Sequence, residues 1–193
     1  GLAARYTEAD LRAIAQGSPL FPSVDWQSQV LRSTAFTHDF NLTLEGNERR
    51  FRYFVYANYN GYDGLFNNTQ MNEGYNTQYQ NSCLKLRTNL EAEMTRTTKL
   101  RINMMGRLSQ TQQPYAGTYV SDIYSTPAIA FPLKTEDGLW ARSELFGNPL
   151  ARYTQGGYSV AVQRTLLADL ALVQDLSMIT PGLSFTLKGA FDN

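Results

Sequence analysis

The feature that most constrains this chain is a strict alternation of apolar and polar residues, a period typical of β-strands rather than helices. It is clearest over residues 84–94, where apolar side chains alternate with lysine, arginine, asparagine and glutamate. Residues 100–108 repeat the pattern, and the polar segment 95–99 separates the two. Because successive side chains of a strand point to opposite faces, each segment has one apolar and one polar face. The pair predicts an antiparallel hairpin.

Two further pairs of segments share this period, and each has a short polar turn between its strands. The expected strands cover residues 40–44, 52–59, 166–172 and 183–191. The expected turns contain Gly46-Asn47-Glu48 and Thr180-Pro181-Gly182. The sequence therefore predicts an all-β fold, an antiparallel up-and-down meander of about six strands in three hairpins.

The N-terminal part has a helical rather than a strand period. Thr7 followed by Glu8 and Asp10 is typical of a helix start, and Gly17 is typical of a helix end. A second short helix is expected from the cap Asp25 through residue 31. Two short helices therefore precede the strands.

The connections between the hairpins differ from the turns inside them. Residues 60–80 and 110–157 are long, polar and rich in Asn, Gln, Gly and Tyr. In a meander, alternating short turns and long loops leave from opposite ends of the sheet, an asymmetry typical of outer-membrane barrels. We therefore expect residues 38–193 to be a partial transmembrane β-barrel wall, with residues 1–37 as a helical segment of an external loop.

A soluble antiparallel sandwich or lipocalin-like barrel shows the same alternation, because its apolar face forms a core instead of facing lipid. Tyr53 and Tyr59, near the ends of an apolar face, fit the aromatic girdle of a membrane barrel. Strand length and loop asymmetry favour the barrel wall. A soluble β-sandwich or β-barrel carbohydrate-binding protein remains the alternative.

Composition argues against several function classes. Lys+Arg and Asp+Glu both total 17, so the chain lacks the basic field that binds nucleic acid. Cys83 and His38 are the only residues of their types, which excludes a disulfide framework and a multi-histidine metal site within the chain. With a single histidine and a single cysteine, we expect no Ser-His-Asp or Cys-His catalytic group either. We expect no enzymatic activity, no metal and no cofactor.

The first hairpin and the loop after it carry recognisable motifs. The chain reads H-D-F-N-L-T-L-E-G at 38–46, R-Y-F-V-Y-A-N-Y at 52–59 and G-L-F-N-N at 64–68, with N-P-L-A at 148–151. These segments resemble the SusC/RagA group of TonB-linked outer-membrane proteins, whose first barrel hairpin reads H-N-L-S-V-S-G and then R-Y-F-V-S-L-G-Y. The resemblance extends over most of the chain, from Thr7 to Phe191.

The resemblance implies a plugged barrel of about 22 strands in the outer membrane of a Gram-negative bacterium. Such a barrel imports glycan or peptide nutrients with a SusD-like surface lipoprotein and energy from the TonB complex. Because the chain shows no TonB box and no plug, we expect a piece of the barrel that follows the plug, with TonB contacted through an absent N-terminal part. Open sheet edges and an apolar face would make an isolated fragment self-associate.

The connection after the first hairpin concentrates aromatic rings and amides. Rings stack on the apolar faces of sugars and amides bond to their hydroxyls, so an oligosaccharide or peptide ligand is expected there. A solvated loop held by local Asn turns is the plainer interpretation. The candidate ligand-binding residues are Tyr59, Tyr62, Asn67, Asn68, Tyr75 and Tyr79.

Charged residues recur on the polar faces of the central strands. Opposite charges across a hairpin most simply form cross-strand ion pairs, although they also suit a polar lumen. The residues concerned are Lys85, Arg87, Glu91, Glu93, Arg101 and Arg107.

Overall fold

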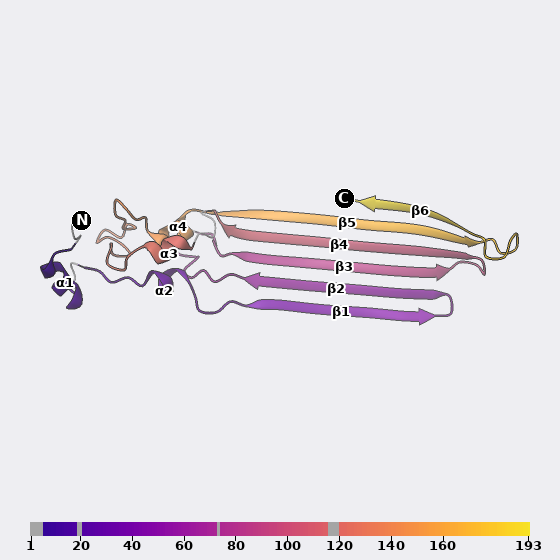
Figure 1. The fold of residues 1–193 in the computed structure, drawn as a ribbon, viewed down its shortest axis with the longest axis horizontal. Coiled ribbons are helices and arrows are strands. Elements are labelled where there is room, and N and C mark those ends of the chain that lie inside the picture. The colour runs from indigo at the N-terminus through magenta and orange to yellow at the C-terminus, as the bar shows by residue number, and fades with distance from the viewer. Residues whose placement is uncertain (1–5, 19–20, 73, 116–119) are drawn as a thin grey trace. The chain divides into compact units, whose positions relative to one another are not determined.

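The computed structural model describes residues 6–18, 21–72, 74–115 and 120–193 and has a mostly-β fold (Figure 1). Within these residues, six strands form a single antiparallel sheet in the order β1-β2-β3-β4-β5-β6, and the sheet is not closed. The predicted six-stranded meander is confirmed. The strands are β1 (Thr37–Glu48), β2 (Phe51–Asp63), β3 (Gln80–Glu93), β4 (Thr98–Pro114), β5 (Tyr158–Asp175) and β6 (Ser184–Asp192).

Short helices accompany the sheet, and the two predicted near the N-terminus are present. Thr7 caps the first through a reciprocal capping box with Asp10, and Asp25 caps the second by accepting from the backbone N–H groups of residues 27 and 28. Gly17 adopts a φ of 67°, the left-handed conformation that ends many helices. The helices are α1 (Glu8–Ala15), α2 (Trp26–Val30), α3 (Ser121–Ser125) and α4 (Pro149–Gln155).

The first hairpin turns three residues later than the sequence predicted. Gly46-Asn47-Glu48 lies inside β1, and only Arg49 and Arg50 separate the paired residues Glu48 and Phe51. Gly46 pairs with Tyr53, and a Cβ added at Gly46 would lie only 2.5 Å from Cε1 of the Tyr53 ring. An aromatic side chain that covers a glycine on the neighbouring strand lets the glycine remain within the sheet. The turn prediction at residues 46–48 was therefore wrong.

Three strands extend into segments that the sequence assigned to loops. β2 continues to Asp63 and β3 begins at Gln80, where Asp63 pairs with Gln80 and Tyr62 with Asn81. β4 also runs to Pro114, whereas β5 begins at Tyr158, directly after the predicted loop. The long connections are therefore residues 64–79 and 115–157 rather than 60–80 and 110–157. The strand ends are polar in sequence and therefore looked like loops, but their backbone groups are paired in the sheet.

The chain divides into two units, which are described separately. The loop unit comprises Gly1–Ala35, Gly64–Tyr79 and Gln112–Ser159, and the sheet unit comprises Phe36–Asp63, Gln80–Thr111 and Val160–Asn193. The loop unit has a hydrophobic core formed by Trp26, Val30, Phe66, Ile123, Phe131, Ala141, Leu150 and Tyr153.

Specific contacts stabilise this core. The indole Nε1 of Trp26 donates to the carbonyl of Pro127 at 3.2 Å, and the rings of Phe66 and Tyr153 stack with centroids 4.7 Å apart. Residues distant in sequence thus form one packed core, so the polar connections are a folded part of the protein.

The sheet unit has almost no buried apolar side chains. Among its described residues, only Cys83 and Ala171 are apolar and buried. One face of the sheet instead carries large exposed apolar side chains on every strand. They include Phe40, Leu42, Leu44, Tyr53, Leu84, Leu86, Met104, Leu108, Leu170, Leu172, Phe185 and Leu187.

Candidate functional site

Two of the six candidate ligand-binding residues, Tyr59 and Tyr62, lie in β2 rather than in a loop. The ring of Tyr59 stacks beside that of Phe40 at a centroid distance of 6.5 Å, and the same tyrosine pairs with Leu84 on its other side. Tyr59 therefore belongs to the exposed apolar face of the sheet unit.

Asn67 and Asn68 belong to the loop unit, where they donate hydrogen bonds to backbone carbonyls of α2. The Asn67 side chain donates to the carbonyl of Ser28 at 3.1 Å, and that of Asn68 donates to the carbonyl of Gln29 at 2.8 Å. The backbone N–H of Asn67 adds a hydrogen bond of 2.7 Å to the carbonyl of Val30. These bonds satisfy carbonyls near the end of a helix, which have no partner within it. Both amides thus have structural partners.

Tyr75 and Tyr79 also lie in the loop unit. The Tyr75 hydroxyl donates to the carbonyl of Gln155 at 3.1 Å, and its ring lies 6.0 Å from that of Tyr158. Tyr79 packs against the hydrophobic core of the unit, and its carbonyl accepts from the N–H of Gly64 at 2.6 Å. The six candidates therefore divide between the units: four in the loop unit and two in the sheet unit.

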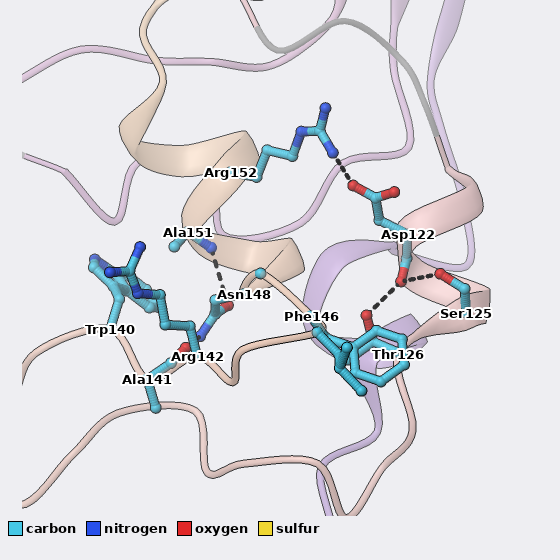
Figure 2. A pocket seen from close by; sticks show the side chains of 12 residues that line it. Asp122, Ser125, Thr126, Trp140, Ala141, Arg142, Phe146, Asn148, Ala151 and Arg152 are labelled. Carbon is cyan, nitrogen blue, oxygen red and sulfur yellow. Dashed lines mark hydrogen bonds and ion pairs between the residues drawn. The ribbon is translucent and has the colours of Figure 1, made fainter.

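A hollow of about 650 Å³ in the loop unit offers a different candidate site (Figure 2). It lies among α3, the segment before α4, and α4 itself. Its volume is within the range of about 300 to 1,000 Å³ usual for small-molecule sites. The lining residues are Asp122, Ser125, Thr126, Trp140, Ala141, Arg142, Leu145, Phe146, Gly147, Asn148, Ala151 and Arg152.

Asn148 fixes the wall of this hollow. Its side-chain oxygen accepts from the N–H of Ala151 at 3.1 Å, which makes it the N-cap of α4. Its amide nitrogen donates to the carbonyls of Leu133 and Ala141, each at 3.0 Å. Pro149 follows as the first helical residue, where its missing N–H costs nothing. One buried amide thus joins the segment before α4 to the helix.

The lining of the hollow carries more positive than negative side chains. Arg152 on α4 makes an ion pair with Asp122 on α3, and Figure 2 shows the two side chains reaching toward each other. The backbone carbonyl of Asp122 also accepts from the Thr126 hydroxyl at 2.7 Å. Arg142 forms no hydrogen bond or ion pair with any described residue. Two guanidinium groups therefore face one carboxylate.

Aromatic side chains complete the lining. Trp140 is partly buried against the core, and the Lys134 ammonium lies 4.8 Å from the centroid of its ring, a cation–π contact. Phe146 also packs against the core. In the α4 helix itself, burial raises the pKa of the Tyr153 hydroxyl, and the negative charge of Asp122 adds to the effect. That tyrosine is therefore a neutral core residue at physiological pH.

On the polar face of the sheet unit, side chains form a continuous hydrogen-bonded network. The Asn58 amide donates to the side chains of Asp39 at 2.8 Å and of Asn41 at 2.9 Å. Asn41 accepts as well from the Tyr56 hydroxyl at 2.8 Å, and Asn60 donates to Asn58 at 3.3 Å. Such a network meets the hydrogen-bonding needs of neighbouring polar groups.

The predicted cross-strand ion pairs are confirmed for two carboxylates. Glu91 pairs with Arg101 at 2.8 Å and with Arg52 at 3.9 Å, while Glu93 pairs with Lys99 at 3.2 Å. These groups are partly exposed, so each pair stabilises the sheet by about 1 kcal/mol at most.

Two arginines of the polar face do not pair with carboxylates. Arg87 bonds to Asn89 on its own strand at 3.3 Å, and the Arg107 guanidinium donates to the sulfur of Cys83 at 3.4 Å. Cys83 and Arg107 therefore join β3 to β4 through a side-chain hydrogen bond.

Other kinds of site find little support in the described ranges. No cluster of three or more His, Cys, Asp or Glu side chains suited to a metal ion occurs among the described residues. Likewise, none of the helices in those ranges has the length and hydropathy needed to cross a bilayer.

Sequence reasoning did not identify Trp140, Arg142 or Asp122 as neighbours of one hollow. The one local signal was Asn148-Pro149, which is typical of a helix start. It marks the beginning of α4, whose residues line one side of the hollow. The approach of α3 to α4 had no counterpart in local sequence, because it depends on packing around Leu150.

Comparison with known proteins gives no match, either to a family model or to a curated protein.

Proposed function

We propose that this chain is part of the barrel wall and surface loops of a TonB-dependent outer-membrane importer of glycan or peptide nutrients, similar to the SusC/RagA group. The observation that carries the proposal is the exposed apolar face of a single open sheet whose opposite face is polar. A bilayer supplies the apolar environment that such a face needs.

Register supports this assignment. Phe40, Tyr59 and Leu84 lie side by side on three successive strands, and Leu42, Ala57 and Leu86 form the next row. Phe40 is 65% exposed and Leu42 is 56% exposed, so these rows face outward rather than into a core. A water-exposed apolar surface of this extent is unfavourable, whereas contact with lipid removes the cost.

Strand dimensions also fit a bilayer. β2 has 13 residues, β3 has 14 and β4 has 17, whereas about 9 to 11 tilted residues cross the hydrocarbon region. The turns after β1, β3 and β5 are short, and the connections after β2 and β4 are long. This asymmetry agrees with periplasmic turns and extracellular loops.

The polar face then lines the barrel interior. The network around Asn58 and the ion pairs of Glu91 satisfy polar groups that would be costly against lipid. The proposal assigns the chain to the outer membrane of a Gram-negative bacterium, with a SusD-like lipoprotein at the surface and the TonB complex as the energy source.

Labelling successive residues of β3 tests the assignment. In a Cys83→Ser background, single cysteines replace Leu86 and Leu90 on the apolar face, or Arg87 and Asn89 on the polar face. Each is coupled to an environment-sensitive fluorophore in chain reconstituted with lipid. We expect blue-shifted emission and quenching by spin-labelled acyl chains at the even-numbered positions only.

The same scan distinguishes the soluble alternative. Blue-shifted even positions without quenching by lipid, in a chain that is monodisperse without detergent, would indicate an internal core and a soluble carbohydrate-binding protein. Quenching at odd and even positions alike would contradict both interpretations. Light scattering with and without detergent supplies the measurement of association.

A further inference from the structure

The hollow between α3 and α4 contains a cation that no described residue neutralises. Arg142 is exposed and has no described partner, while Arg152 uses part of its guanidinium on Asp122. A guanidinium carries five N–H donors in a planar fork, so Arg152 retains donors after this pairing. The lining therefore offers charge-assisted hydrogen bonds to an incoming carboxylate.

Asp122 restricts where that carboxylate can lie. The negative charge of Asp122 repels a second carboxylate nearby. Asp122 lies in α3, and its ion pair with Arg152 keeps its carboxylate on that side of the hollow. In Figure 2 Arg142 and Trp140 lie on the other side of the view from Asp122. A ligand anion is thus directed toward Arg142.

The remainder of the lining suits a hydroxylated ring. Trp140 and Phe146 provide aromatic surface, and the hydroxyls of Ser125 and Thr126 provide hydrogen-bonding groups. Thr126 donates to a backbone carbonyl, which leaves its oxygen able to accept from a ligand hydroxyl. Sugars combine apolar C–H faces with hydroxyl groups, a combination that aromatic and polar side chains bind together.

We infer that this hollow binds an acidic sugar residue of an oligosaccharide, with its carboxylate on Arg142 and its ring among Trp140, Phe146 and the hydroxyls of α3 and Thr126. The inference rests on the proposed function, because it gives the surface loops of the importer a ligand class. It uses none of the six tyrosines and asparagines expected from the sequence.

Calorimetric titration of the full chain in detergent tests the inference. The probes are a disaccharide of glucuronic acid and N-acetylglucosamine, its methyl ester, and an N-acetylated dipeptide with a free C-terminal carboxylate. We expect the acid to bind at least tenfold more tightly than the ester, since a hydrogen bond to a charged group corresponds to about a tenfold to hundredfold effect.

Variants locate the binding site. Arg142→Gln should weaken binding of the acid about tenfold and leave the weak binding of the ester unchanged. Arg12→Gln is the matched control, because it makes the same change at an exposed residue of the loop unit outside the hollow. Far-ultraviolet circular dichroism checks that each variant is folded.

Three results would overturn the inference: equal binding of acid and ester, the same loss in Arg12→Gln as in Arg142→Gln, or binding of the dipeptide in preference to the saccharide. Failure here leaves the barrel-wall proposal untouched, because the lipid-quenching scan of β3 does not depend on this hollow. If the even-numbered positions of β3 were not quenched by lipid but the acidic disaccharide still bound, the hollow would belong to a soluble carbohydrate-binding protein instead.

Discussion

Replacing Leu150 with alanine tests whether the long connections form a cooperatively packed unit. Leu150 lies in α4 with 0% of its surface exposed, in the cluster that includes Trp26 and Tyr153. The change removes three carbon atoms, worth about 2.4 kcal/mol in transfer free energy at about 0.8 kcal/mol each. The cavity left behind adds to this cost, so we expect a loss of about 3 to 5 kcal/mol in the free energy of unfolding of the loop unit.

Urea denaturation of the full chain in detergent, followed by tryptophan emission, measures this loss because Trp26 is buried in the same core. Leu145→Ala is the matched control, since Leu145 is 70% exposed and its truncation should change stability by about 0.5 kcal/mol or less. A loss below about 1 kcal/mol in Leu150→Ala, or equal effects of the two variants, would refute the packed core.

Two further predictions concern backbone packing and a helix cap. Gly64→Ala should destabilise the loop unit by about 1 to 3 kcal/mol, because the added Cβ would lie 2.8 Å from the Cβ of Tyr79 and 2.9 Å from its carbonyl oxygen. Gly147→Ala, where no atom lies within 4 Å, should melt like the wild type in thermal unfolding. Hydrogen bonds from the Thr7 backbone N–H and hydroxyl lower the pKa of Asp10 below its ordinary value of 3.8. The stabilisation of α1 is therefore complete above that value and is lost as pH falls through the folded-state pKa. Carbon chemical shifts of α1 between pH 5 and 2 should show this loss, and Asp10→Asn should weaken its pH dependence.

The fold class followed from local sequence because period-2 alternation is a property of each strand alone. Residues 84–94 and 100–108 predicted β3 and β4 before any pairing was known, and the caps Thr7 and Asp25 predicted α1 and α2. These signals are local: a side chain's face or a cap's hydrogen bond depends on residues within a few positions.

Strand ends and the first turn were less predictable. Gly46-Asn47 looks like a turn when only neighbours are considered, yet the Tyr53 ring on the opposite strand covers the glycine. Tyr62 and Asn81 look like loop residues, yet each has the other as its partner in the sheet. Pairing across the sheet decided these positions, since it supplies hydrogen bonds and contacts that composition does not reveal.

The candidate ligand residues show the same division. The sequence predicted that rings and amides of one connection bind a ligand, but Tyr59 and Tyr62 lie in β2. Asn67 and Asn68 bond to carbonyls of α2. The hollow beside α3 and α4 brings together Asp122, Arg142 and Arg152 from segments 10 to 30 residues apart. No local pattern links them.

The sequence by itself determined which segments alternate apolar and polar residues and where the first two helices begin. It also showed that the chain has too few cysteines and histidines for a disulfide framework or a multi-histidine metal site. The tertiary structure decided that the sheet remains open with its apolar face exposed and that the polar connections pack around Leu150 and Trp26. The reason is physical: alternation and capping are set by neighbouring residues, whereas burial and charge pairing require segments that meet only when the chain folds.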